Sequence, residues 1–146
     1  RKPVPDAPAP ADTAAGRLTQ MRQMARDFTA HMQADGEWEL RLLPQPLFRY
    51  GEPDGSVVDG ALFTYVWTKG TDPEVVLLLE CKMGDKGPAW HFAPVRFSNR
   101  PLALQYKDNE VWSAASHQEP AETNTLLYTT AFTRTMSQPP PAEPEN

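Results

Sequence analysis

The chain has 146 residues, 40% of them hydrophobic and 10% aromatic, which is enough to bury the core of one domain. Its formal net charge of −5 argues against nucleic acid or an anionic membrane surface as a partner, because both need clustered positive charge. The longest apolar run, Val75–Leu79, is far shorter than a membrane-spanning helix, so we expect no membrane insertion.

Proline is concentrated at both ends of the chain. Four of the 16 prolines lie in residues 1–12 and four in residues 138–146. Such segments form extended, solvated chain without a core. The sequence therefore predicts a disordered tail at 1–12, one domain at 13–137 and a second disordered tail at 138–146. A Pro/Ala-rich start is typical of the segment after a removed signal peptide, so we expect an exported protein, periplasmic or at the cell surface, although an artificial boundary would look the same.

The first predicted element is a helix that starts after Asp12 or Thr13 and ends at Gly36. Apolar side chains recur from Leu18 to Met32 at spacings of three and four residues, which places them in one stripe. Such a stripe fits a helix that lies on a sheet. A helix that dimerises with a second copy is the alternative.

After Gly36 the apolar period changes from 3.6 to 2, which predicts strands. Pro44 and Pro46 cannot donate to a ladder, so the first strand must end there or follow a sheet edge. The run Val75–Leu79 does not alternate and is typical of a central strand that is covered on both faces. The predicted strands are 37–42, 47–50, 57–69, 74–82, 89–98, 102–107, 110–114 and 125–136, with a tight turn at Asp108 and Asn109.

No helical pattern separates these strands, which argues against parallel βαβ units. The predicted fold class is α+β, with one N-terminal amphipathic helix packed on a strongly bent antiparallel sheet of six to eight strands, in the form of a roll or partial barrel. A β-sandwich with a docked helix is the alternative.

Motifs for catalysis or metal binding are absent from the sequence. The three histidines and the lone Cys81 have no metal-ligand spacing, and no nucleophile elbow, phosphate-binding loop or dinucleotide motif is present. Cys81 fits a small buried hydrophobe, Glu80 the wet end of a strand, and Asp59 a residue that bonds backbone amides in a turn. We expect no metal, no cofactor, no catalytic residue and a non-enzymatic domain.

Three functional hypotheses follow from the aromatic residues and the polar residues near them. The first is an interaction domain that binds a protein partner or forms a homodimer. The second is a small-molecule pocket between helix and sheet, and the third is a hydrolase or isomerase that uses His91 with Glu80 or Asp59. The candidate binding residues are Arg49, Tyr50, Trp67, Glu80, Trp90 and His91.

The stretch LLPQPLFRY at residues 42–50 has two interpretations. Its prolines fix an extended backbone, which can cover the core with Leu47 and Phe48 inside and Arg49 outside. The same stretch can instead present a polyproline-like surface to a partner.

Three motifs carry a resemblance that spans about residues 38–112: PQPLFRY at 44–50, DGALF at 59–63 and TDPEV at 71–75. With them the chain resembles an uncharacterised family of small bacterial proteins that commonly carry an export signal. The resemblance implies an exported protein. It implies no activity and no site residues.

Overall fold

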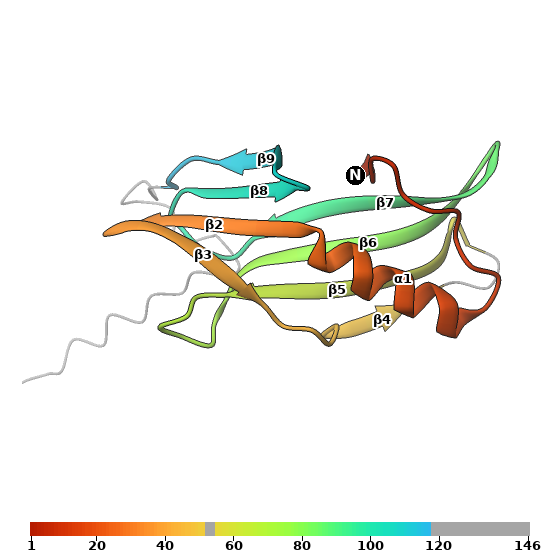
Figure 1. Cartoon of the computed structure of the whole chain (residues 1–146), viewed down its shortest axis with the longest axis horizontal. Coiled ribbons are helices and arrows are strands. Elements are labelled where there is room, and N and C mark those ends of the chain that lie inside the picture. The colour runs from red at the N-terminus through yellow and green to blue at the C-terminus, as the bar shows by residue number, and fades with distance from the viewer. Residues whose placement is uncertain (52–54, 118–146) are drawn as a thin grey trace, which may run out of the picture.

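The computed structural model describes residues 1–51 and 55–117. In these ranges the chain forms one helix and nine strands (Figure 1). Their bounds are β1 Lys2–Pro3, α1 Ala14–Arg26, β2 Phe28–Ala34, β3 Gly36–Leu42, β4 Phe48–Tyr50, β5 Val57–Val66, β6 Pro73–Gly84, β7 Gly87–Arg96, β8 Leu102–Tyr106 and β9 Asn109–Ala114.

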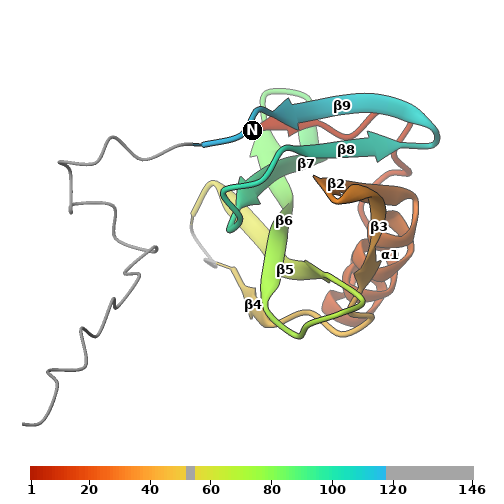
Figure 2. The same cartoon turned by 90° about the vertical axis from the view of Figure 1, so that its left-hand side faces the viewer.

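The strands form one antiparallel sheet in the order β1-β7-β6-β5-β3-β2-β8-β9, and β4 pairs with β5 beside this path. The sheet curls into a half-barrel, seen end-on in Figure 2. Its two end strands approach each other closely enough for Lys2 Nζ of β1 to donate to the Val111 carbonyl of β9 at 3.0 Å. The predicted bent antiparallel sheet with one helix is therefore confirmed, and the described strands do not form a sandwich.

The helix is shorter than predicted. Thr13 caps its start, as expected, by accepting the Gly16 N–H at 3.1 Å. The helix ends at Arg26, and the residues after Asp27 form β2, whereas the sequence predicted helix up to Gly36. The reason is that a spacing of four residues fits a strand as well as a helix. In β2 the alternate side chains Phe28, Ala30 and Met32 are buried, and both edges pair, with β3 and β8.

The proline-rich stretch breaks one strand path into β3 and β4, and β4 pairs only with β5, so the predicted end or edge at the prolines is confirmed. The predicted orientation of these side chains is wrong. Leu47 and Phe48 are 59% and 60% exposed, whereas Arg49 points inward to Asp59. Leu42 pairs with Tyr65, and Phe48 pairs with Leu62. The chain therefore advances six positions between these two pairs, while β5 advances only three. An odd excess of residues reverses which side chains face the core.

The first residues belong to the fold, which differs from the disordered tail predicted for 1–12. Lys2 and Pro3 pair with β7, and Val4 is buried in the core. Gln20 of α1 then holds the following segment, since its side chain accepts the Ala11 N–H and donates to the Ala9 carbonyl. The predicted strand at 125–136 and the predicted tail at 138–146 lie outside the described residues.

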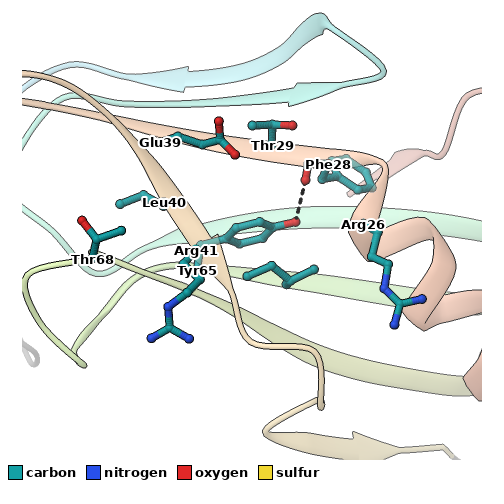
Figure 3. A pocket seen from close by; sticks show the side chains of 9 residues that line it. Arg26, Phe28, Thr29, Glu39, Leu40, Arg41, Tyr65 and Thr68 are labelled. Carbon is teal, nitrogen blue, oxygen red and sulfur yellow. Dashed lines mark hydrogen bonds between the residues drawn. The ribbon is translucent and has the colours of Figure 1, made fainter.

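The sheet splits where β3 crosses from β2 to β5. Leu40 of β3 pairs with Ala30 of β2, and continuing this register would place Leu42 opposite Phe28. Leu42 pairs with Tyr65 of β5 instead. The separating strands and the end of α1 surround a cleft of about 540 Å³ (Figure 3).

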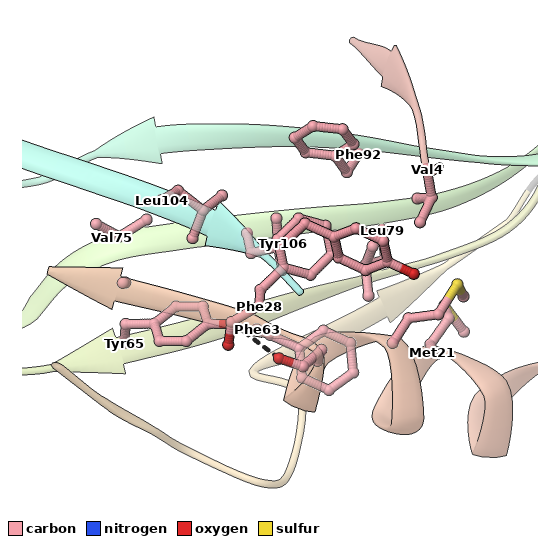
Figure 4. Close-up of a cluster of buried hydrophobic side chains, with 14 of the residues drawn as sticks. Val4, Met21, Phe28, Phe63, Tyr65, Val75, Leu79, Phe92, Leu104 and Tyr106 are labelled. Carbon is pink, nitrogen blue, oxygen red and sulfur yellow. Dashed lines mark hydrogen bonds between the residues drawn. The ribbon is translucent and has the colours of Figure 1, made fainter. Parts of the chain in front are cut away.

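Buried side chains fill the inside of the curled sheet (Figure 4). The helix packs on this inner face, against β2, β5 and β6, and the Tyr65 hydroxyl donates to the Ala25 carbonyl at the helix end. Strand β6 is central, as predicted, and Cys81 is a buried thiol whose pKa is raised by that burial. No helix in the described part of the chain is long and apolar enough to cross a membrane.

Candidate functional site

The six predicted binding residues do not form one pocket. Trp90 is buried in the core, at 2% exposure. Trp67 lies beyond the end of β5, where its ring contacts Trp38 edge-on and the Arg100 guanidinium lies 4.9 Å from its centroid. The remaining four, Arg49, Tyr50, Glu80 and His91, lie on β4, β6 and β7, and β5 separates β4 from β6 in the sheet.

Asp59 is the centre of a buried ionic cluster on the inner face. Arg17 Nε of α1 donates to Asp59 Oδ2 at 2.9 Å, and Arg49 of β4 donates to both carboxylate oxygens at 2.9 and 2.6 Å. Arg17 also donates to the carbonyls of Ala11 and Asp12. The prediction that Asp59 bonds backbone amides is therefore wrong. The cluster joins α1, β4 and β5.

Glu80 is the centre of a second cluster, on the outer face that points away from α1. The Tyr50 hydroxyl donates to Glu80 Oε1 at 2.7 Å, and Arg1 Nη2 donates to the same oxygen at 3.0 Å. The Glu80 side chain is 1% exposed, whereas that of Arg1 is 50% exposed. Glu80 is thus not the wet end of a strand, as predicted, but a carboxylate covered by a tyrosine and by the first residue of the chain.

Both carboxylates are held in their charged form. Burial opposes ionisation of Asp59, but the hydrogen bonds from Arg49 and Arg17 outweigh it and hold its pKa below the ordinary value. Burial likewise opposes ionisation of Glu80, and the hydrogen bonds from Tyr50 and Arg1 lower its pKa. Burial and the Glu80 carboxylate raise the pKa of Tyr50. These groups are poor proton donors or acceptors near neutral pH.

The proposed pairing of His91 with a carboxylate has little geometric support. His91 pairs in register with Glu80 across β6 and β7, so the two share the outer face, whereas Asp59 points to the inner face. His91 Nδ1 lies 3.3 Å from the Ala89 carbonyl oxygen, whereas Glu80 accepts hydrogen bonds from Tyr50 and Arg1. The arrangement supports a packed structural cluster rather than general acid–base catalysis.

Gly60 provides the space in which Tyr50 reaches Glu80. A Cβ atom added at Gly60 would lie 2.8 Å from Tyr50 Cζ, so the ring rests on the glycine backbone. We expect Gly60→Ala to lower the free energy of unfolding by about 1 kcal/mol in urea titrations. Displacing the ring breaks a hydrogen bond to a charged group, worth about 1.5–3 kcal/mol, while alanine regains about 0.4–1 kcal/mol through the unfolded chain.

A Tyr50→Ala background provides the control for this substitution. Without the ring, Gly60→Ala should no longer destabilise the protein. An equal cost in both backgrounds would show that the strain arises elsewhere in β5.

A row of apolar side chains crosses the outer face next to the Glu80 cluster. Cross-strand pairing places Phe48 beside Leu62, Leu62 beside Leu78, and Leu78 beside Ala93, so the row spans β4, β5, β6 and β7. Phe48 is 60% exposed, and the other three are half-buried. We call these four residues the outer row. No local pattern in the sequence reveals the outer row, because the row depends on the register between strands.

The cleft at the split of the sheet is a concave feature, and none of the six predicted residues lines it. Its walls are Arg26, Phe28, Thr29, Glu39, Leu40, Arg41, Leu42, Tyr65 and Thr68. Its volume falls in the range of small-molecule sites, about 300–1,000 Å³. The sequence carried no signal for it, since strand pairing alone opens it.

Within the described ranges, no group of three or more histidine, cysteine, aspartate or glutamate side chains could hold a metal ion. No family model, no curated protein and no solved structure matches the chain. Function is therefore inferred from the chemistry of these sites.

Proposed function

We propose that this chain is a non-catalytic, exported interaction domain whose outer face binds a protein partner. The observation that carries this proposal is the outer row, which places Phe48 and its apolar neighbours on the sheet face opposite α1. Phe48 is 60% exposed and adjoins three half-buried apolar side chains, and an exposed aromatic side chain beside apolar neighbours is typical of the anchor of an interaction site. The resemblance to exported bacterial proteins supports the location.

The charges beside the outer row favour a particular kind of partner. Arg1 and Lys82 lie near Glu80, and Arg1 already neutralises that carboxylate. Lys82 therefore leaves the rim of the outer row positive. A partner surface with an apolar centre and an acidic rim would complement it, with an aromatic anchor at Phe48.

Site-specific crosslinking tests this proposal. A photoreactive benzoyl-phenylalanine at position 48 should give one discrete crosslinked protein in cells of the source organism. The same group at Lys107, in the β8–β9 turn, should not. The Leu78→Asp variant should lose the crosslink, and high salt should weaken binding of the purified partner because the rim is charged.

Two results would overturn the proposal. A crosslink to a second copy of this chain, with a dimer in sedimentation that Phe48→Asp dissolves, would replace the partner by a homodimer. Equal crosslinking from positions 48 and 107 would show that the outer row has no special role.

A second candidate function is small-molecule binding, and the observation that favours it is the cleft at the split of the sheet. It uses different residues from the outer row, so the two functions can be tested separately.

A further inference from the structure

Two arginines of the cleft differ from the other arginines of the described chain. Elsewhere in residues 1–51 and 55–117, each arginine side chain has a partner: Arg1, Arg17, Arg22, Arg49 and Arg96 donate hydrogen bonds, and Arg100 lies over Trp67. Within the same ranges, the side chains of Arg26 and Arg41 have no hydrogen bond, ion pair or ring contact. Both line the cleft.

The placement of these arginines follows from the fold. Arg26 is the last residue of α1, and Arg41 is the residue of β3 at which pairing changes from β2 to β5. Figure 3 shows them on either side of the Tyr65 ring. Two cations that the described residues leave unpaired therefore flank one cleft.

The floor between the arginines is apolar. Phe28, Leu40 and Tyr65 are buried side chains that reach the cleft, and Leu42 is half-buried beside them. The Tyr65 hydroxyl is turned to the helix end, where it donates to the Ala25 carbonyl at 2.8 Å and to the Phe28 carbonyl at 3.3 Å, the latter contact being drawn in Figure 3. With its hydroxyl engaged there, Tyr65 offers its ring to the cleft.

Backbone groups also face this cleft. Leu43 donates its N–H to the Thr64 carbonyl of β5. Because hydrogen bonds alternate along a strand, the N–H and C=O of Leu42 point the other way, toward the side that β2 has left. A ligand can therefore find a hydrogen-bond donor there besides the two guanidinium groups.

One carboxylate also lies at the cleft, that of the exposed Glu39. It reduces the positive charge of the walls from two to one and disfavours an anion on its side. The remaining charge is still positive in a chain whose formal net charge is −5.

We propose that this cleft binds a small amphipathic carboxylate, with its apolar body on Phe28, Leu40, Leu42 and Tyr65 and its charge held at the rim by the guanidinium group of Arg26 or that of Arg41. Guanidinium groups recognise carboxylates through paired hydrogen bonds, and an apolar floor with few polar groups is the usual composition of a ligand site. This proposal rests on the second candidate function, small-molecule binding at the cleft, and names its ligand class. It does not depend on the proposed protein partner of the outer row.

Octanoate and octylammonium, two probes of equal chain length and opposite charge, test the proposal. Isothermal titration calorimetry or amide chemical shifts of Thr29 and Leu42 would give both affinities. We expect wild-type protein to bind octanoate at least tenfold more tightly than octylammonium. In the Arg26→Gln/Arg41→Gln double variant this ratio should fall to about one, and Glu39→Gln should raise octanoate affinity severalfold.

Matched controls separate a specific site from general attraction. The Lys86→Gln/Lys107→Gln double variant removes the same charge from exposed turns and should keep the ratio. Phe48→Asp, which disrupts the outer row, should also keep it. Arg26 and Arg41 are exposed, so their variants should fold, which circular dichroism checks. The proposal is overturned if the double variant at the cleft keeps the preference for octanoate, or if wild-type protein binds both probes equally.

Discussion

Replacing Asp59 with asparagine should lower the free energy of unfolding by about 3 kcal/mol, the largest effect we expect from one polar substitution in this chain. The substitution leaves the guanidinium groups of Arg17 and Arg49 without a counter-charge, and their side chains are only 14% and 32% exposed. An unpaired charge that is held away from water costs far more than the pair itself contributes. Urea denaturation at pH 7 measures the change.

Two control variants show whether the loss comes from the unpaired arginines. Asp85→Asn, at an exposed turn, should change stability by no more than about 0.5 kcal/mol. The combined variant Asp59→Leu/Arg17→Met/Arg49→Met removes all three charges and should recover most of the loss, since apolar replacements of buried ionic clusters are often nearly neutral. A loss below about 1 kcal/mol in Asp59→Asn would mean that both arginines reach water without the carboxylate.

The protein should lose stability steeply in acid, below about pH 5. Asp59 and Glu80 both have a lower pKa in the folded protein than their ordinary values of 3.8 and 4.5. The unfolded chain therefore binds protons at a higher pH than the folded one. The stability that these carboxylates contribute is complete above the ordinary pKa values and disappears as the pH falls through the folded ones.

Urea midpoints between pH 7 and pH 3 measure this dependence in the wild type and in Asp59→Asn. The variant should start lower and decline less, because one of the two titrating groups is gone. Curves that run parallel over the whole range would show that Asp59 does not contribute to the acid transition. Glu80→Gln should reduce the slope in the same way, with a smaller loss at pH 7, since its partner Arg1 is half exposed and can return to water.

Local patterns in the sequence predicted much of the sheet. Proline at 44 and 46 predicted the interruption and the edge position of β4, and the uninterrupted run Val75–Leu79 predicted a central strand. The tight turn between β8 and β9 was predicted at Asp108 and Asn109, and the positive φ angles lie at Lys107 and Asp108, one residue earlier. These features depend on a few neighbouring residues, so a sequence pattern is sufficient to locate them.

The partners of the charged residues were not predictable in this way. Asp59 meets Arg17 across 42 positions of sequence, and Glu80 meets Arg1 across 79. Of the six predicted binding residues, Tyr50, Glu80 and His91 come together, because β4, β6 and β7 lie near one another in the sheet. Trp67 and Trp90 do not join them. An aromatic residue in a strand has the same local signature in the core and on the surface.

By itself, the sequence determined where most strands begin and end and that no familiar catalytic or metal motif is present, since strand alternation, proline and turn residues act over a few positions. Only the tertiary structure decided that the segment after Asp27 is a strand. It also decided that an excess of three residues turns Phe48 outward and Arg49 inward, and that β3 leaves β2 to open a cleft between two arginines. The physical reason is that strand pairing and register are set by contacts between distant segments, and a shift of one residue exchanges the two faces of a strand.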